Sequence, residues 1–203
     1  MDPFLGRYYV GRRYLRECRL YHVLGTYTPT GNKAHYCCDS LEYSNDNSVS
    51  MEHHLIEKKT AGDILMQEIT EADYERGIEL FYKSLLQIRQ YITSLKGIPC
   101  DHIQAGKAYR FFDHLYLNVH QNPKGNYFES QYLEIAPSSV TIRGTWISSS
   151  LSETNRINYE EITSSDAQKA IKQFELFYAT IRNYINSLVK EDPPYGSFVI
   201  GKR

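Results

Sequence analysis

The chain contains two copies of one sequence pattern, and this repeat limits its fold more than any other feature. The segment 68–95 aligns without a gap to the segment 161–188, at a constant offset of 93 positions (161 − 68). Polar positions match as well as apolar ones, which a shared helical periodicity alone does not explain. The identities are Glu68/Glu161, Ile69/Ile162, Thr70/Thr163, Asp73/Asp166, Ile78/Ile171, Phe81/Phe174, Ile88/Ile181, Arg89/Arg182, Tyr91/Tyr184, Ile92/Ile185, Ser94/Ser187 and Leu95/Leu188.

Looser matches continue upstream of these segments. Their offset drifts by a residue or two between blocks, as insertions in loops would cause. We therefore predict an internal duplication, with a first unit at 1–98 and a second unit at 99–203. The matched positions are Gly11/Gly106, Tyr14/Tyr109, Leu20-Tyr21/Leu115-Tyr116, the turns at 29–32 and 123–126, and Leu41-Glu42/Leu133-Glu134.

Each unit has the pattern of a β-meander of three or four antiparallel strands, followed by one long amphipathic helix. Turns rich in Gly, Pro and Asn separate the strands. One such unit has a thin core, so we expect the two to pack about a pseudo-twofold axis in an α+β fold. Either one continuous sheet or two facing layers satisfies the pattern. The expected strands are Arg13–Leu24, Lys33–Tyr43, Ser48–Glu57 and Ile64–Glu68, then Tyr109–Val119, Tyr127–Ile135, Val140–Ser148 and Arg156–Glu160.

Both helices begin with a capping pattern. Thr70 is followed three residues later by Asp73, and Thr163 is followed by Asp166. Apolar residues then recur at alternating spacings of three and four, which buries one face of a helix. The two stripes are Ile78, Phe81, Leu85, Ile88, Ile92 and Leu95, and Ile171, Phe174, Tyr178, Ile181, Ile185 and Leu188.

Composition excludes several classes of protein. The formal net charge is -1, so no overall field attracts nucleic acid or anionic lipid. No apolar run approaches the roughly 20 residues that cross a bilayer, and the first fifteen residues do not resemble a signal peptide. We expect a cytoplasmic protein without membrane association, in which the four cysteines are reduced.

A metal site is the first alternative for the histidines. If the turn near residue 30 centres a hairpin, His22 lies opposite His35, with Cys37 on the same face of the sheet. His53 and His54 belong to the next strand. No short ligand pair such as Cys-x-x-Cys occurs, however, and the second unit does not repeat these residues. We therefore expect no metal and no cofactor.

Catalytic motifs are equally weak. The chain has no Gly-x-Ser-x-Gly elbow and no glycine-rich phosphate loop. Cys100, Asp101 and His102 are adjacent in sequence, but neighbours in an extended segment point apart, whereas a triad needs adjacency in space. Glu52 beside His53 or His54 is just as unspecific. We assign no catalytic residue, and an enzyme that assembles dispersed His, Cys and Glu side chains stays an alternative.

The strongest candidate binding surface lies near the N-terminus, where arginines and tyrosines alternate. Arginine and tyrosine often carry interface energy, because each combines a large contact area with directional hydrogen bonds. The second unit lacks this pattern, which suggests that the first unit presents the working surface. The alternative is that the arginines pair with acidic residues of neighbouring strands. The candidate binding residues are Arg12, Arg13, Tyr14, Arg16, Arg19 and Tyr21.

These observations favour a macromolecule-binding protein whose partner is another protein. Immunity proteins and inhibitors of defence systems include small proteins of this kind, which is an association rather than a derivation. A nucleic-acid-binding role for the arginine and tyrosine surface stays an alternative, and homo-oligomers are compatible with the sequence.

Overall fold

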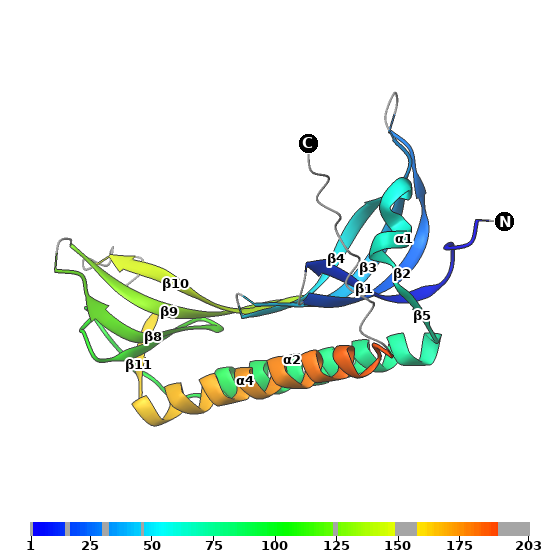
Figure 1. Cartoon of the computed structure of the whole chain (residues 1–203). Coiled ribbons are helices and arrows are strands. Elements are labelled where there is room, and N and C mark those ends of the chain that lie inside the picture. The colour runs from blue at the N-terminus through cyan, green and yellow to red at the C-terminus, as the bar shows by residue number, and fades with distance from the viewer. Residues whose placement is uncertain are drawn as a thin grey trace, which may run out of the picture.

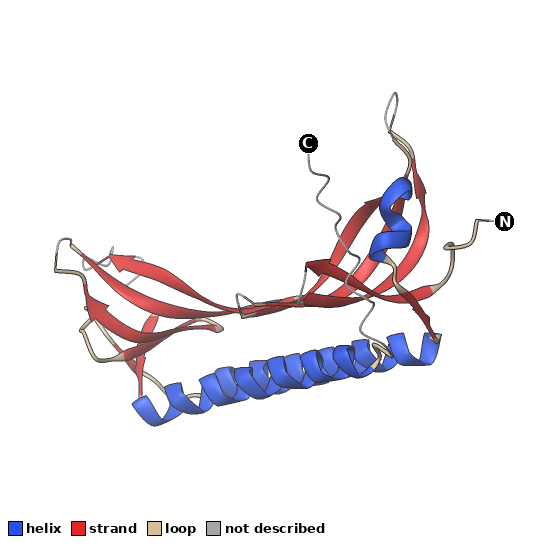
Figure 2. Cartoon of the chain, viewed as in Figure 1, coloured by secondary structure: helices blue, strands red, loops and turns tan. Residues whose placement is uncertain are grey.

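The chain folds into one large antiparallel sheet with helices on its faces. The computed structural model describes residues 2–14, 17–29, 33–45, 47–123, 126–148 and 158–190, without the side chains of 12–14. Eleven strands and three α-helices lie in these residues, which confirms the expected mixed α+β class. Figure 2 shows the sheet as one layer and the two long helices as a second.

The sheet is continuous, so of the two arrangements left open by the sequence it is the single sheet that forms. Its strand order is β5-β1-β2-β3-β4-β10-β9-β8-β7-β11-β6. The first and last strands of each half lie toward the two edges of the sheet, and β4 and β10 meet at its centre. In the first half the strands are β1 (Tyr8–Tyr14), β2 (Glu17–Tyr27), β3 (His35–Ser44), β4 (Ser48–Glu57) and β5 (Gln67–Ile69). In the second half they are β6 (Ile98–Pro99), β7 (Ala108–Phe111), β8 (His114–Gln121), β9 (Tyr127–Ala136), β10 (Ser139–Ser148) and β11 (Tyr159–Ile162).

The two long helices begin where the sequence places them. They are α2 (Glu71–Ser94) and α4 (Ser164–Ser187). The Thr70 hydroxyl accepts a hydrogen bond from the Asp73 backbone N–H at 3.1 Å, and Thr163 accepts one from Asp166 at the same distance. The two helices run antiparallel, side by side, beneath the middle of the sheet (Figure 1). The short α1 (Ala61–Ile64) lies on the opposite face.

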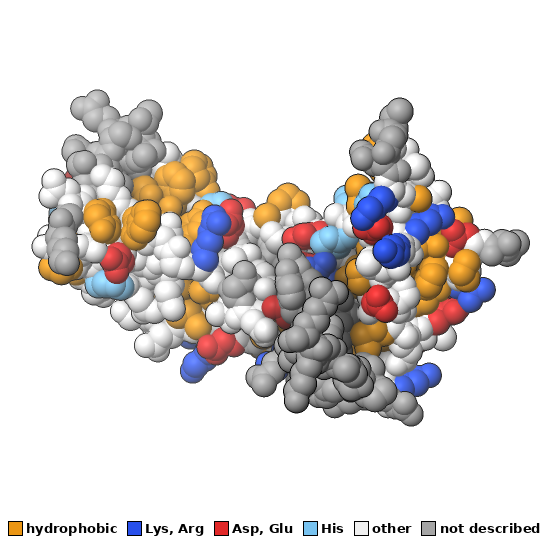
Figure 3. Space-filling view, turned by 45° about the horizontal axis from the view of Figure 1, so that its top comes forward, with side chains coloured by type: hydrophobic (Ala, Val, Ile, Leu, Met, Phe, Trp, Pro, Cys, Tyr) orange, Lys and Arg blue, Asp and Glu red, His pale blue; other side chains and the backbone are white. Residues whose placement is uncertain are grey.

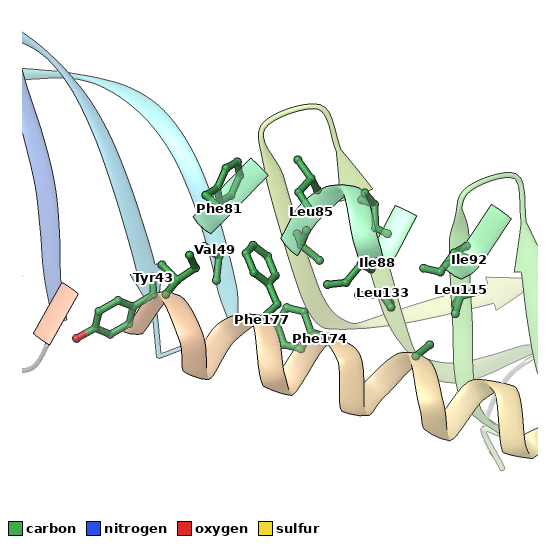
Figure 4. Packing of buried hydrophobic residues seen from close by; sticks show 14 of the residues in the cluster. Tyr43, Val49, Phe81, Leu85, Ile88, Ile92, Leu115, Leu133, Phe174 and Phe177 are labelled. Atoms are coloured by element: carbon green, nitrogen blue, oxygen red, sulfur yellow. The ribbon is translucent and has the colours of Figure 1, made fainter. Parts of the chain in front are cut away.

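One hydrophobic core joins both halves. The apolar stripes of α2 and α4 pack against alternate residues of the central strands, as Figure 4 shows. The Phe81 and Phe177 rings of the two helices lie 5.7 Å apart. Because this core contains residues from both halves of the sheet, each half depends on the other for its buried surface. The largest fully buried side chains in it are Tyr43, Phe81, Leu20, Leu41, Ile92, Leu115, Leu117, Leu133, Ile135, Ile181 and Ile185.

A smaller cluster covers the far face of the sheet at each end. The first half buries Tyr9, Tyr21, Val23, Tyr36, Cys38, Ile56, Ala61 and Leu65 there, with α1 as a cover. The second half buries Ile103, Tyr109, Val119, Phe128, Ile147 and Tyr159. The ends of the sheet can therefore curve away from the long helices and still have a core (Figure 1).

The expected first strand of each unit is wrong in one respect, because it contains a hairpin. β1 ends at Tyr14 and β2 begins at Glu17, so Arg13–Leu24 is not one strand. The second half reverses in the same way at Phe112, which has a φ of 55°. Bulky residues rarely adopt this left-handed conformation, and no glycine marks the turn. The alignment of Gly11 with Gly106 is also displaced, since Gly11 lies inside β1 and Gly106 precedes β7.

The shared core predicts the effect of removing a ring from either stripe. Phe81→Ala and Phe174→Ala should each lower the free energy of unfolding by about 3–5 kcal/mol, since both rings are buried among well-packed side chains. Urea denaturation measures the change. Leu176→Ala is the control, because this side chain is 69% exposed on α4. Equal midpoints for all three variants would contradict the packing described here.

Candidate functional site

The structure describes only part of the predicted arginine and tyrosine surface. Arg12, Arg13 and Tyr14 lie at the end of β1, but their side chains are outside the described residues, as is the whole of Arg16. The remaining two, Arg19 and Tyr21, are buried on the far face of β2, with Arg19 only 4% exposed. The chain reverses between β1 and β2, so the candidate residues are divided between two strands instead of lying on one.

Arg19 is held by an acidic residue of the neighbouring strand. Its Nε lies 2.7 Å from Oε2 of Glu42 on β3, directly opposite in the register, and both side chains are buried. This is the pairing that the sequence left as the alternative for these arginines. Burial raises the pKa of the adjacent Tyr21 hydroxyl, and the Arg19 charge partly offsets that rise. Arg19 and Tyr21 are therefore internal in this fold, and a binding role for the described part of the patch stays a prediction.

His54 and Glu52 of β4 complete a polar cluster around this ion pair. Arg19 Nη1 lies 2.8 Å from His54 Nε2, and the same ring nitrogen lies 3.2 Å from Glu42 Oε2. Ligand atoms of Glu42, Glu52 and His54 lie within 4.8 Å of one another, a spacing that a metal ion could use. Arg19, however, already contacts Glu42 and His54, so its guanidinium supplies the positive charge that a metal ion would bring to these side chains. The cluster therefore fits an internal charge network better than a metal site.

A second polar row crosses the opposite face of the first half. Tyr8, His22, Asp39 and His53 are direct neighbours on β1, β2, β3 and β4. His22 stacks on Tyr8 at 4.3 Å, and Tyr74 of α2 covers both rings. His53 is 88% exposed at its side chain, with Nδ1 against Oδ1 of Asp39.

The expected pairing of His22 with His35 is wrong. His22 lies opposite Asp39, whereas His35 lies opposite Tyr27, because the turn between β2 and β3 is long and a bulge follows Val23. The two histidines are thus held apart along the hairpin. The ring packing around His22 gives it a structural role, so the row does not converge on a metal position.

The cysteines are not assembled into a nucleophilic site. Cys37 and Cys38 point to opposite faces of β3, and burial raises the pKa of the Cys38 thiol to about 12. Cys100 contacts the Tyr159 carbonyl oxygen at 3.5 Å, whereas His102 contacts the Gln104 amide. Cys100 and His102 therefore contact different neighbours, although Asp101 and His102 lie in a bend and not in the expected extended segment.

Among the described residues, the most exposed large aromatic side chain lies on the second half. Trp146 of β10 is the only tryptophan of the chain and is 74% exposed. It shares a sheet face with the buried Val140, since both positions have the same parity on β10. The Tyr127 ring lies 6.0 Å from it. Its neighbour across the strands is Glu129, which contacts His120 at 3.3 Å. No simple sequence rule would find this residue, because its alternation with Val140 predicts burial.

A shallow groove of about 400 Å³ runs between α2 and α4 on their solvent side. None of its lining side chains is acidic, basic, histidine or cysteine, so the groove offers no acid–base chemistry. The residues that line it are Ser84, Gln87, Ile88, Gln173, Leu176, Phe177 and Thr180.

Comparison with known proteins found no matching family model, no similar curated protein and no similar solved structure. In the described residues, no helix is both long enough and apolar enough to cross a membrane.

The buried ion pair predicts strong coupling between its two partners. Arg19→Met should lower the free energy of unfolding by about 3–5 kcal/mol, because Glu42 would remain buried without its cation. Adding Glu42→Leu should recover most of that loss, since an apolar pair can replace a buried ion pair. Urea denaturation of both variants provides the measurement. A loss of less than about 1 kcal/mol for Arg19→Met would mean that the pair is solvated like a surface salt bridge.

Proposed function

We propose that this chain binds another protein through the surface around Trp146. The observation that carries the proposal is the exposure of the single tryptophan, with Tyr127 beside it on the same face. Large aromatic side chains are enriched at the centres of protein interfaces, where they desolvate on binding. Without a partner, such a ring on a sheet surface exposes apolar area to water at a free-energy cost.

The charges near this surface favour a protein over a nucleic acid. Glu129 lies next to Trp146 across the strands and would repel a phosphate backbone. On the face drawn in Figure 3, basic and acidic side chains are interspersed among the described residues. Arg19, part of the predicted basic patch, is neutralised by Glu42. These features support a partner recognised by apolar contact and hydrogen bonds.

An enzyme is the weaker candidate on the same grounds. The groove between the helices lacks titratable side chains, and the His54 cluster is paired within itself. The identity of the partner decides whether the protein acts as an immunity-type protein or an inhibitor. Either role is a form of the same binding function.

We also propose that the two halves are copies related by a pseudo-twofold axis. Reciprocal contacts support this: the Tyr91 hydroxyl donates to the Asp166 carbonyl at 3.2 Å, and Tyr184 donates to the Asp73 carbonyl at 2.6 Å. These positions differ by the same offset of 93 as the sequence repeat. Exchange of equivalent contacts is the property of a symmetric interface.

Two further pairs of contacts agree with that symmetry. Gly6 and Gly106 both have positive φ and donate to the carbonyls of Val23 and Val119, at 2.8 and 2.7 Å. Arg7 pairs with Glu68 at 2.8 Å, and Lys107 pairs with Glu161 at 2.6 Å. The strand register agrees as well. Leu55 of β4 lies opposite Cys37 of β3, and at the corresponding place in the second half Trp146 of β10 lies opposite Glu129 of β9.

If the surface around Trp146 binds the partner, a substitution there should abolish binding. The full chain is used as bait in the cell type that expresses it, with Trp146→Ser and Leu86→Ser as matched variants. Leu86 is also an exposed apolar residue, but lies on α2. Proteins retained by the wild type and by Leu86→Ser should be lost with Trp146→Ser. Retention of every partner by Trp146→Ser would refute the assignment of this surface.

A further inference from the structure

The two halves of the sheet are joined over a very short seam. β4 and β10 each have ten residues, yet they pair only at Ser50/Ser139, Val49/Val140 and Ser48/Thr141. Two flanking hydrogen bonds extend the contact, from Met51 N to the Ser138 oxygen at 2.8 Å and from Ile142 N to the Asn47 oxygen at 3.0 Å. Beyond these, no described strand pairs with the outward side of either strand.

The flanking bonds fix which backbone groups of β10 face outward. In an antiparallel ladder, the N–H and C=O of alternate residues point to the same neighbour. Since Ile142 donates toward β4, the backbone groups of Gly144 and Trp146 point the same way. β10 pairs with β9 along its whole length without a register shift, so its other side is fully used. Gly144 and Trp146 thus form a strand edge without a described partner.

β4 has a comparable edge at His53 and Leu55, but its side chains differ. His53 is engaged with Asp39 of β3. The edge of β10 has no side chain at Gly144, where a Cβ would meet nothing within 4 Å. It also presents Trp146, the most exposed large apolar residue described. The β10 edge is therefore the more open of the two.

We propose that an extended segment of a protein partner adds as a strand to the edge of β10, pairing with Gly144 and Trp146. This proposal rests on the proposed protein-binding function and names the partner's form. Unpaired backbone groups at strand spacing select another strand, because only a peptide backbone offers donors and acceptors in the same alternation. The exposure of Trp146 follows from the same geometry: its cross-strand neighbour on that side is the residue that the partner supplies.

The position of the seam favours a single short segment over the edge of a second folded sheet. β4 begins at Ser48, opposite Thr141, and runs antiparallel to β10, so the edge lies beyond the start of β4, next to Asn47, whose carbonyl oxygen accepts from Ile142 N. Between Ile142 and the end of β10 at Ser148 only Gly144 and Trp146 face outward, a length that one extended segment covers. We expect the segment to place an apolar side chain against Trp146 and Tyr127 and to have no proline at the pairing positions.

The test uses peptides of about ten residues, the length of a strand, selected from a random display library on the full-length protein and then synthesised. Trp146 is the only tryptophan, so its fluorescence reports directly on this edge, and binding should shift its emission to shorter wavelength. N-methylation of successive peptide residues then removes one donor at a time. We expect affinity to fall about tenfold or more at every second position and to change little between them, because alternate groups face β10.

A matched substitution in the protein tests the same backbone hydrogen bonds by its effect on peptide affinity. Gly144→Pro removes an outward donor while leaving the ladder with β9 intact, so it should weaken peptide binding by a similar factor. If this variant does not fold, as judged by circular dichroism, the N-methyl series alone decides. A flat N-methyl series, or selected peptides that leave Trp146 emission unchanged, would overturn strand addition. Dimerisation of the unmodified chain that Gly144→Pro abolishes would overturn it in favour of self-pairing.

These outcomes are distinct from failure of the proposed function. A flat N-methyl series together with partner loss on Trp146→Ser means that the surface binds a protein through side chains alone. The protein-binding function would then stand and strand addition would not.

Discussion

The packing of α2 against α4 under the centre of the sheet is the constraint on which the rest of the structure depends. Phe81 and Phe177 meet between the helices, and the same core reaches strands of both halves. A meander with one helix has too little apolar surface to be stable alone. Sharing one helix pair resolves this for both halves at once, which explains why a short β4–β10 seam is enough to join them.

The helix pair covers the middle of the sheet and leaves its ends to separate cores. Each end buries its own cluster on the far face. Where the sheet curves away, the long helices no longer cover its other face, so side chains on that face are exposed there. The first half places His53 and Asp39 there, and the second places Trp146 and Glu129. The two ends therefore share a framework and differ in the chemistry that they present.

The sequence predicted the parts of the fold that local chemistry determines. The threonine caps and the stripes through Phe81 and Phe174 define both long helices, and the Gly, Pro and Asn turns separate most strands. The reversal at Phe112 was missed because that turn uses a bulky residue at positive φ. Arg19 was expected on a surface, since its burial depends on Glu42, which is remote in sequence. The exposure of Trp146 was equally hidden, because it depends on where the sheet leaves the helices.

The proposal requires that β10 continue beyond its short pairing with β4 with an open edge at Gly144 and Trp146. Residue-resolved amide hydrogen exchange of the native chain, followed by NMR, tests it without any partner. The backbone N–H groups of Gly144 and Trp146 should exchange rapidly, whereas those of Thr145 and Ile147, which face β9, should be protected. Equal protection of all four residues would show that the edge is already paired and would contradict the account.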